Sequence, residues 1–322
     1  MAKMNTDWFH DAKWGVFTHW CGGAASPKEW NARVDAFDVD LLARQLAEIK
    51  AGYYFITVGQ CSGFYCAPNE TYNRLVQHDE SHCSGRDLVS DIADALEPYS
   101  IRTMVYLAAC GPMGDPYATK KLKLICDQTL GWGVEGNRAH KSQRLVEFMR
   151  NWEAICRDWS LRWGRKVHGW WFDACCYYLE QDWWGDDQPS FRTFASAVKA
   201  GNPDAIAAFN SGVQSPVITT SEYEDFTAGE LAEYMPLGTR MVTGMLHPLS
   251  RFMDGTQWHV LIHLGTHWGA TPAMLPTELV VGYTKYVNRH GGVITWDTGI
   301  DEVGNLQKDH FEQLKALAAA TR

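Results

Sequence analysis

The sequence predicts a single (β/α)₈ barrel, a fold in which eight parallel strands alternate with helices. Eight short apolar stretches rich in β-branched and aromatic residues alternate with longer amphipathic patterns along the 322 residues. A doubly wound sheet is the rival fold, but the segment after the first stretch, HWCGGAASP, lacks the GxGxxG spacing of a dinucleotide loop. No linker, low-complexity segment or internal repeat divides the sequence, so we expect one domain over residues 1–322.

The expected strands are bounded by polar or glycine-containing segments, and the expected helices carry apolar residues at positions i, i+3, i+4 and i+7. The strands are expected at 14–20, 53–59, 101–109, 167–174, 205–212, 224–229, 259–265 and 292–298. The clearest helical patterns cover 40–52, 87–98, 143–164, 277–292 and 307–320. The repeated order of strand and crossover helix is typical of a barrel.

The composition is that of an ordinary globular protein, with 46% hydrophobic residues, 21% charged residues and a net charge of −9. This acidic balance argues against nucleic acid or an anionic membrane as a partner. No apolar stretch reaches the roughly 18 residues that span a bilayer. The N-terminus has no apolar signal-peptide core, so we expect a cytoplasmic protein; a homo-oligomer is left open.

The nine cysteines are odd in number and irregular in spacing, which favours reduced, mostly buried thiols over disulfides. We expect this of the adjacent Cys175 and Cys176 as well. Cys61, Cys66, His82 and Cys83 could together supply the ligands of a zinc ion. The sequence contains no CxxC pair and no HExxH motif, so we expect neither a metal nor a cofactor.

In a barrel of this kind the active site forms at the carboxyl ends of the strands. The polar residues at the expected strand ends are His19, Gln60, Cys61, Asp173, Asn210, Glu230, His263 and Asp297. Asp173 is notable because it closes the apolar stretch VHGWWFDACCYY, residues 167–178. These side chains are therefore the candidates for a site at the mouth of the barrel.

Two carboxyl groups on opposite sides of a scissile bond are the minimum for glycoside hydrolysis. Asp173, at the end of the fourth strand, is the candidate nucleophile, and Glu230, near the mouth of the sixth, is the candidate acid. Asp297 is a third contender. The plain alternatives are a loop-anchoring carboxylate for Asp173 and a surface residue for Glu230. The 15 tryptophans suit a carbohydrate cleft, although most must belong to the core.

Several segments, in order along nearly the whole chain, resemble the α-L-fucosidase family of retaining glycoside hydrolases (family 29). WFHDAKWGVFTHW is similar to the family's opening Trp-Phe-x-Asp-Ala-Lys-Phe-Gly-Ile-Phe-x-His-Trp-Gly pattern, and KEW resembles the Glu-Trp that follows it. GWWFDA resembles the nucleophile strand, and DFTAGE is similar to a segment that carries the acid/base in some members. The resemblance thus implies a barrel with glycosidase activity.

This resemblance implies a role for several individual residues. It makes Asp173 the nucleophile and Glu230 the acid/base. Residues expected to bind the sugar are His19, Glu29 and Trp30, with Trp171 and Trp268 as aromatic walls. The substrate would be an oligosaccharide or glycoside, cleaved from its end by a retaining exo-glycosidase.

The sequence departs from the family after the second strand, where a Lys-His-His-Asp-Gly-Phe run is replaced by GQCSGF. Gln60, Cys61 and Phe64 then stand at sugar-binding positions. Replacing two imidazoles by an amide and a thiol points to a different sugar or to lost fucosidase activity. Fucose stays possible, but another L-sugar or 6-deoxy sugar is favoured. The β-sandwich domain common in the family is not expected after the barrel.

Two other hypotheses remain. One is a catalytically silent barrel that binds carbohydrate, which the lost sugar contacts favour. The other is metal-assisted chemistry using Cys61, His263 or His19.

Overall fold

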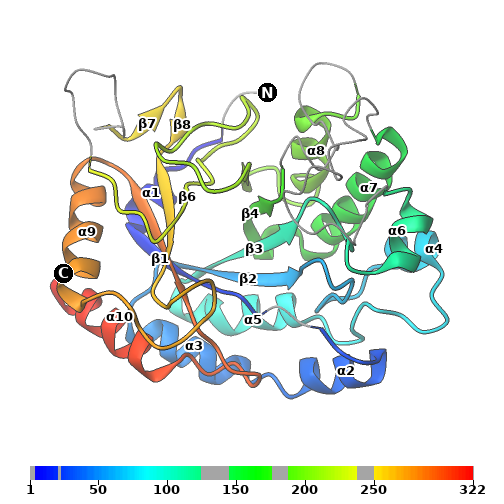
Figure 1. Ribbon diagram of the computed structural model, residues 1–322, viewed down its shortest axis with the longest axis horizontal. Helices are drawn as coiled ribbons and strands as arrows, with labels where there is room; N and C mark the ends of the chain where they lie inside the picture. The colour runs from blue at the N-terminus through cyan, green and yellow to red at the C-terminus, as the bar shows by residue number, and fades with distance from the viewer. Residues whose placement is uncertain (1–3, 21–22, 125–144, 176–187, 238–249, 322) are drawn as a thin grey trace.

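The computed structural model describes residues 4–20, 23–124, 145–175, 188–237 and 250–321. Eight parallel strands form one curled sheet in the order β5-β4-β3-β2-β1-β10-β9-β6 (Figure 1). These strands are β1 (Trp14–Thr18), β2 (Tyr53–Gly59), β3 (Arg102–Ala108), β4 (Val167–Asp173), β5 (Ile206–Phe209), β6 (Glu230–Ala232), β9 (His259–His263) and β10 (Val293–Thr298). The predicted (β/α)₈ fold class is confirmed. A short antiparallel hairpin, β7 (Phe252–Met253) and β8 (Thr256–Gln257), stands apart from this sheet.

The sheet does not close by direct pairing of its edge strands, β5 and β6. Residues 225–229 lie between the two sides instead: the Asp225 N–H donates to the Ala207 carbonyl at 2.8 Å, and the Asp225 carbonyl accepts from the Gln257 N–H at 3.0 Å. The strand expected at 224–229 is therefore wrong in position, because the regular strand begins only at Glu230. Gly229 explains the break. Its φ is +63°, and a Cβ there would lie 2.0 Å from the His259 carbonyl oxygen.

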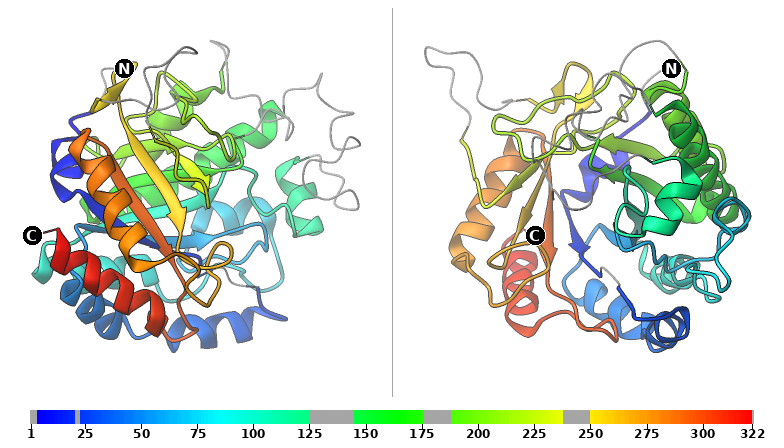
Figure 2. Two further views of the ribbon diagram at one scale, coloured as in Figure 1. Left: turned by 60° about the vertical axis from the view of Figure 1, so that its left-hand side comes forward. Right: turned by 45° about the vertical axis from the view of Figure 1, so that its right-hand side comes forward.

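Most helices lie around the outside of the sheet, as the two further views in Figure 2 show, whereas α1 (Asp7–Ala12) contributes Phe9 to the interior cluster. The other helices are α2 (Pro27–Asp35), α3 (Val39–Glu48), α4 (Glu70–Val76), α5 (Leu88–Leu96), α6 (Pro116–Leu122), α7 (Val146–Trp163), α8 (Phe191–Val198), α9 (Thr277–Arg289) and α10 (Lys308–Ala320), with 3₁₀ turns at Glu97–Tyr99 and Gly164–Lys166. All five helical patterns expected from the sequence are present. Several begin at an aspartate that accepts a backbone N–H, as Asp87 does from Ser90 at the start of α5.

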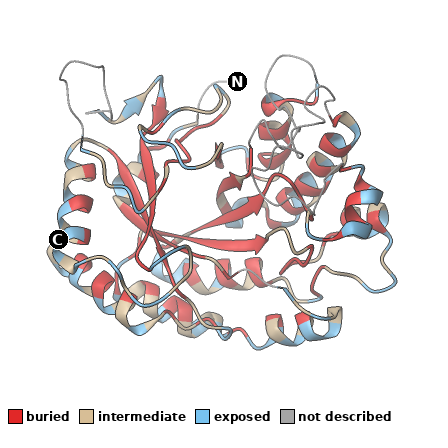
Figure 3. Cartoon of the chain, in the orientation of Figure 1, coloured by how far each residue is buried: buried red, intermediate tan, exposed pale blue. Residues whose placement is uncertain are grey.

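Alternating side chains of each strand face the interior of the sheet or the surrounding helices. Tyr106 and Trp171 belong to the interior cluster, whereas their neighbours Val105 and Phe172 pack under the helices. Figure 3 shows the strands as the most deeply buried part of the chain. Since Asp173 follows Trp171 by two residues, its side chain lies on the interior face, at the carboxyl end of β4.

The six cysteines among the described residues are all free thiols, as predicted, and Cys175 is one of them; Cys176 lies outside the described residues. The zinc cluster considered from the sequence does not form in that part of the chain. The one group of potential ligands that comes together there is His78, His82 and Asp115. Among the helices that the structure describes, none is long and apolar enough to cross a membrane.

A buried ion pair fixes the 225–229 segment to the rest of the barrel. The Lys199 ammonium donates to Asp225 Oδ2, and both side chains are almost completely buried. The Asp225 carboxylate also accepts the backbone N–H groups of Met4 and Ala207, both at 2.9 Å. Removing one member of such a pair leaves the other charge buried without compensation.

We therefore expect Lys199→Met to lower the free energy of unfolding by about 3–5 kcal/mol in chemical denaturation. The matched control is Lys166→Met, which removes an exposed lysine paired with Asp94. That exposed pair should contribute less than about 1 kcal/mol. Equal effects of the two substitutions would contradict the assignment of Lys199 and Asp225 as a buried, structurally important pair.

Candidate active site

Asp173 is the last residue of β4, and three donors orient its carboxylate. The Tyr106 hydroxyl donates to Oδ2 at 2.7 Å. Oδ1 accepts from the Asn210 amide at 2.9 Å and from the backbone N–H of Ala174 at 2.7 Å. Ala174 has a φ of +60°, a left-handed conformation that is uncommon for a residue with a Cβ. The strained turn and the three donors together fix this carboxylate at the mouth of the barrel.

Glu230 lies beside Asp173, on the far side of a single amide group. The Asn210 Nδ2 that donates to Asp173 also donates to Glu230 Oε2, at 2.6 Å. Asp173 Oδ1 and Glu230 Oε2 therefore accept from the same nitrogen, at 2.9 and 2.6 Å. The distance between these two oxygens cannot exceed the sum of the two hydrogen-bond lengths. This maximum agrees with the separation of roughly 5–5.5 Å between the carboxyl groups of retaining glycosidases. It is shorter than the roughly 6.5–9.5 Å of inverting ones.

The environments of the two carboxyl groups differ in a way that suits an acid. Burial, reinforced by the negative charge of Asp173, raises the pKa of Glu230 to about 7. The hydrogen bond from Asn210 and the nearby His19 act in the opposite direction on this pKa, but they are weaker. Glu230 can thus carry a proton near neutral pH, as a general acid must.

Tyr106 connects this pair to the loop after β2. The Gln60 side-chain amide donates to the Tyr106 hydroxyl at 3.1 Å, and that hydroxyl donates onward to Asp173. The Tyr106 ring stacks on Trp171 with centroids 5.4 Å apart. Tyr106 was not among the predicted site residues. Its place two residues before the end of β3, beside β4 and on the interior face, is the signal that could have identified it.

If Asp173 acts on a glycoside, replacing Tyr106 by phenylalanine should lower kcat/KM about 10–100-fold. The lost hydrogen bond to a charged group is worth roughly 1.5–3 kcal/mol, and each 1.4 kcal/mol corresponds to a factor of ten. The matched control is Tyr283→Phe, a tyrosine on α9 whose hydroxyl donates to the Pro236 carbonyl. If Tyr106→Phe kept full activity, the hydroxyl would not be needed to position Asp173.

A second polar group lies around His19, which follows β1. Its Nδ1 is 2.7 Å from Asp297 Oδ1, and since an ionised carboxylate can only accept, this contact assigns a proton to Nδ1. Asp297 is buried, and its other oxygen accepts the Gly269 N–H at 2.6 Å. These contacts assign Asp297, the third carboxylate considered, to the orientation of His19. Trp268 packs between His19 and His263, with ring centroids 5.5 and 5.0 Å away.

Three of the aromatic residues expected to contact the sugar are buried in the protein interior. The Trp30 ring is 1% exposed and donates to the Tyr65 carbonyl at 2.9 Å. Trp171 is 4% exposed and donates to the Ala228 carbonyl at 3.0 Å, which places it beneath Tyr106 in the barrel interior. Phe64 is also buried and stacks on His82. The structure uses these rings mainly as packing around the site.

Glu29 and Cys61, also expected at the sugar, contact other groups. Glu29 is exposed at the start of α2, where it accepts the Ala25 N–H at 2.9 Å. The Cys61 Sγ lies 3.7 Å from the Sγ of Cys110, a buried thiol. The hydrogen bond with Cys61, together with burial, raises the pKa of the Cys110 thiol.

The residues suggested for metal-assisted chemistry each have a separate partner. His19 contacts Asp297, Cys61 contacts Cys110, and His263 donates from Nδ1 to the Gly265 carbonyl at 2.8 Å. Within the described part of the chain they do not form a common ligand set.

No protein-family model matches the sequence, and no curated protein matches it. Solved structures do match the fold. An endo-fucoidan hydrolase of glycoside hydrolase family 107, MfFcnA4, superposes with a TM-score of 0.71 and 19% identity over 97% of this chain and 53% of its own. The chain thus spans about half the length of that protein. Another family 107 endo-fucoidan hydrolase, P5AFcnA, matches with a TM-score of 0.70 and 14% identity over 99% of this chain and 94% of its own.

Alpha-L-fucosidases share the fold as well. The enzyme AlfC from Lactobacillus casei, in complex with its alpha-L-fucose product, matches with a TM-score of 0.61 and 14% identity. The match covers 98% of each chain. At these identities the comparisons establish the architecture, which two groups of fucose-related hydrolases share with this chain.

Proposed function

We propose that this protein is a retaining glycoside hydrolase that acts on fucose or on a related L- or 6-deoxy sugar. The observation that carries the proposal is the pair of carboxyl groups joined by the Asn210 amide, of which Glu230 has its pKa raised to about 7. One group can be ionised while the other is protonated, at the short separation that double displacement needs.

In the first step of the proposed reaction, the Asp173 carboxylate attacks the anomeric carbon and Glu230 donates its proton to the leaving oxygen. The glycosidic bond breaks as a glycosyl ester to Asp173 forms. In the second step Glu230 takes a proton from water, and the water oxygen displaces Asp173 from the sugar. Tyr106, Asn210 and the Ala174 N–H hold the nucleophile in position throughout.

The proposed sugar rests on two observations. The fold is shared by proteins described as endo-fucoidan hydrolases and as alpha-L-fucosidases. The loop after β2 places Gln60 at the Tyr106–Asp173 chain, where its amide can take part in recognising a sugar hydroxyl. We propose that the enzyme is exo-acting. Its sugar preference would differ from that of an ordinary fucosidase, because a site built around particular hydroxyl contacts discriminates strongly between sugars.

The experiment is a panel of aryl α- and β-glycosides, including aryl α-L-fucoside and other L- and 6-deoxy sugars, together with fucoidan oligosaccharides. Proton NMR should show that the first-formed product of a turned-over substrate keeps the anomeric configuration of that substrate. Product of the opposite configuration would contradict the retaining assignment. Binding of sugars without turnover of any panel member would favour the catalytically silent barrel.

A further inference from the structure

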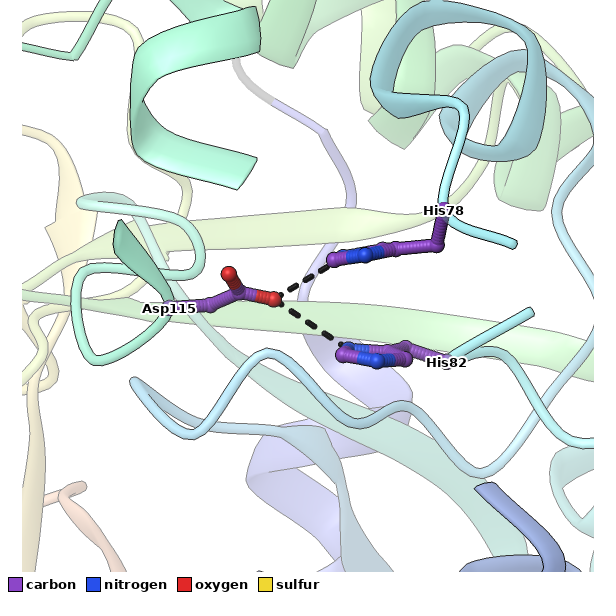
Figure 4. Close-up of side chains that lie close together, drawn as sticks. All are labelled: His78, His82 and Asp115. Carbon is purple, nitrogen blue, oxygen red and sulfur yellow. Dashed lines mark hydrogen bonds and ion pairs between the residues drawn. The ribbon is translucent and has the colours of Figure 1, made fainter. Parts of the chain in front are cut away.

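A cluster of three potential ligands lies outside the site described above. His78 and His82 come from the loop between α4 and α5, and Asp115 precedes α6 (Figure 4). Asp115 Oδ2 is 2.9 Å from His78 Nε2 and 3.2 Å from His82 Nδ1. The three ligand atoms all lie within 4.8 Å of one another, and each side chain is at least four-fifths buried.

The two oxygens of Asp115 have separate tasks. Oδ1 caps α6 by accepting the N–H groups of Tyr117 and Ala118, both at 3.0 Å. Oδ2 is directed at the two imidazoles. His82 Nδ1 is buried, and among the described residues Asp115 Oδ2 is the acceptor that lies near it. The nitrogen and oxygen atoms of all three side chains therefore converge on one small region.

The two imidazoles lie within a stack of aromatic rings. The rings of Phe64, His82, His78 and Tyr117 follow one another in a stack, with centroid separations of 4.4, 3.7 and 4.9 Å. Gly63 leaves room on the other side, since a Cβ there would lie 3.1 Å from Asp115 Oδ2. Residues from three separate segments, at positions 63–64, 78–82 and 115–117, are thus packed around three converging ligand atoms.

We propose that His78, His82 and Asp115 bind one divalent transition-metal ion of the zinc type. Two imidazole nitrogens and one carboxylate oxygen suit zinc and its neighbours, whereas calcium and magnesium prefer oxygen ligands alone. The nitrogen–oxygen separations of 2.9 and 3.2 Å are close to the roughly 3.3 Å between ligands of a tetrahedral zinc ion bound at about 2.0–2.1 Å. The ion would lie in the plane of each ring, so the two imidazoles would turn apart on binding.

The role of this ion is structural. It joins the loop after α4 to the loop between β3 and α6, and the latter touches the loop after β2 through the Gly114 N–H and the Cys61 carbonyl, 2.5 Å apart. Binding to this folded arrangement alone would stabilise it by linkage. The proposal is independent of the proposed hydrolase activity, and its test uses no substrate.

The test begins with protein dialysed against a chelator and then given zinc or cobalt(II). We expect about one zinc per chain by elemental analysis, a zinc-dependent rise in Tm, and d–d absorption from bound cobalt(II). His78→Ala and His82→Ala should each weaken zinc binding by at least about 100-fold, the upper end of what losing an outer partner of a metal ligand costs. His290→Ala, which changes a histidine at the end of α9, should bind zinc as the unaltered protein does.

Asp115→Asn distinguishes a loss of zinc binding from a folding defect, because its amide oxygen can still cap α6 while the charge of the ligand is lost. This variant should melt at the unaltered temperature without zinc and lose the zinc-dependent rise in Tm. Failure of the unaltered protein to bind zinc would overturn the proposal. Equal zinc binding by the His78→Ala/His82→Ala double variant would overturn it as well.

Discussion

Replacing Asp173 by alanine is expected to lower kcat/KM for an aryl glycoside that the protein hydrolyses by at least about 10⁴-fold, or about 5 kcal/mol of transition-state stabilisation. The reason is that the proposed reaction has no covalent step without this carboxylate. The fold should survive, because Asp173 lies at the end of β4 and its donors, Tyr106 and Asn210, remain near the barrel mouth. Circular dichroism and a thermal melt check this directly.

Azide gives the Asp173→Ala experiment a positive readout. A small anion can enter the space left by the carboxylate and attack the anomeric carbon of a substrate with a good leaving group. We expect azide to restore turnover and to give a glycosyl azide of the configuration opposite to that of the substrate, because only one displacement then occurs.

The control for this experiment is Asp204→Ala, which removes an exposed carboxylate paired with Arg165. It should leave kcat/KM unchanged. If Asp173→Ala retained the activity of the unaltered protein, Asp173 would not be the nucleophile. A variant that is inactive, folded and unresponsive to azide in the presence of an activated substrate would leave Asp173 in a binding role only.

The fold class and the two carboxyl groups could be predicted from the sequence because both depend on local patterns. Apolar stretches of strand length mark the barrel, and the position of Asp173 at the end of one such stretch places it where barrel chemistry occurs. Glu230 was identified by the same reasoning, although the expected strand stopped one residue before it. The backbone turn at Gly229, which moves the strand, depends on the approach of the His259 backbone and leaves no periodic signal.

The rest of the site depends on which way side chains point and on contacts between distant segments. Trp30 and Trp171 match positions of a sugar-binding family, yet both indoles are buried and bonded to backbone carbonyls. Tyr106 contacts a carboxylate 67 residues away. His78 and His82 meet Asp115 only because two loops fold against each other. None of these contacts follows from residue spacing within one segment.

Replacing Glu230 by glutamine should have an effect that depends on the leaving group. Glutamine cannot donate the proton, and general acid catalysis is worth about 10²–10⁴-fold. We expect a loss in this range for sugars with poor alcohol leaving groups and a much smaller loss in the first step for an aryl group that leaves without protonation. A uniform loss across leaving groups of differing pKa would contradict the role of Glu230 as the acid.

The pH dependence follows from the protonated state of Glu230. With its pKa raised to about 7, the unaltered protein should lose kcat/KM above about pH 7 as the acid gives up its proton. Glu230→Gln should lack this alkaline limb while keeping the remaining activity on activated substrates. An alkaline limb at the same pH in the variant would assign the titration to another group.

The same ionisation has the opposite consequence for stability. A carboxyl group whose pKa is raised in the folded state resists ionisation there, so stability falls as pH rises from the unfolded pKa near 4.5 to the folded value of about 7. Below that window both states are protonated and the cost is absent; above it the cost is fully present.

Glu230→Gln removes the charge and keeps a group of similar size beside Asn210. We therefore expect it to raise the free energy of unfolding by roughly 2 kcal/mol at pH 8 and to change it little at pH 4.5. Urea denaturation at the two pH values measures both quantities. A more stable but less active variant at pH 8 would mean that the fold holds Glu230 in surroundings that disfavour its charge, which is what a proton donor at neutral pH requires.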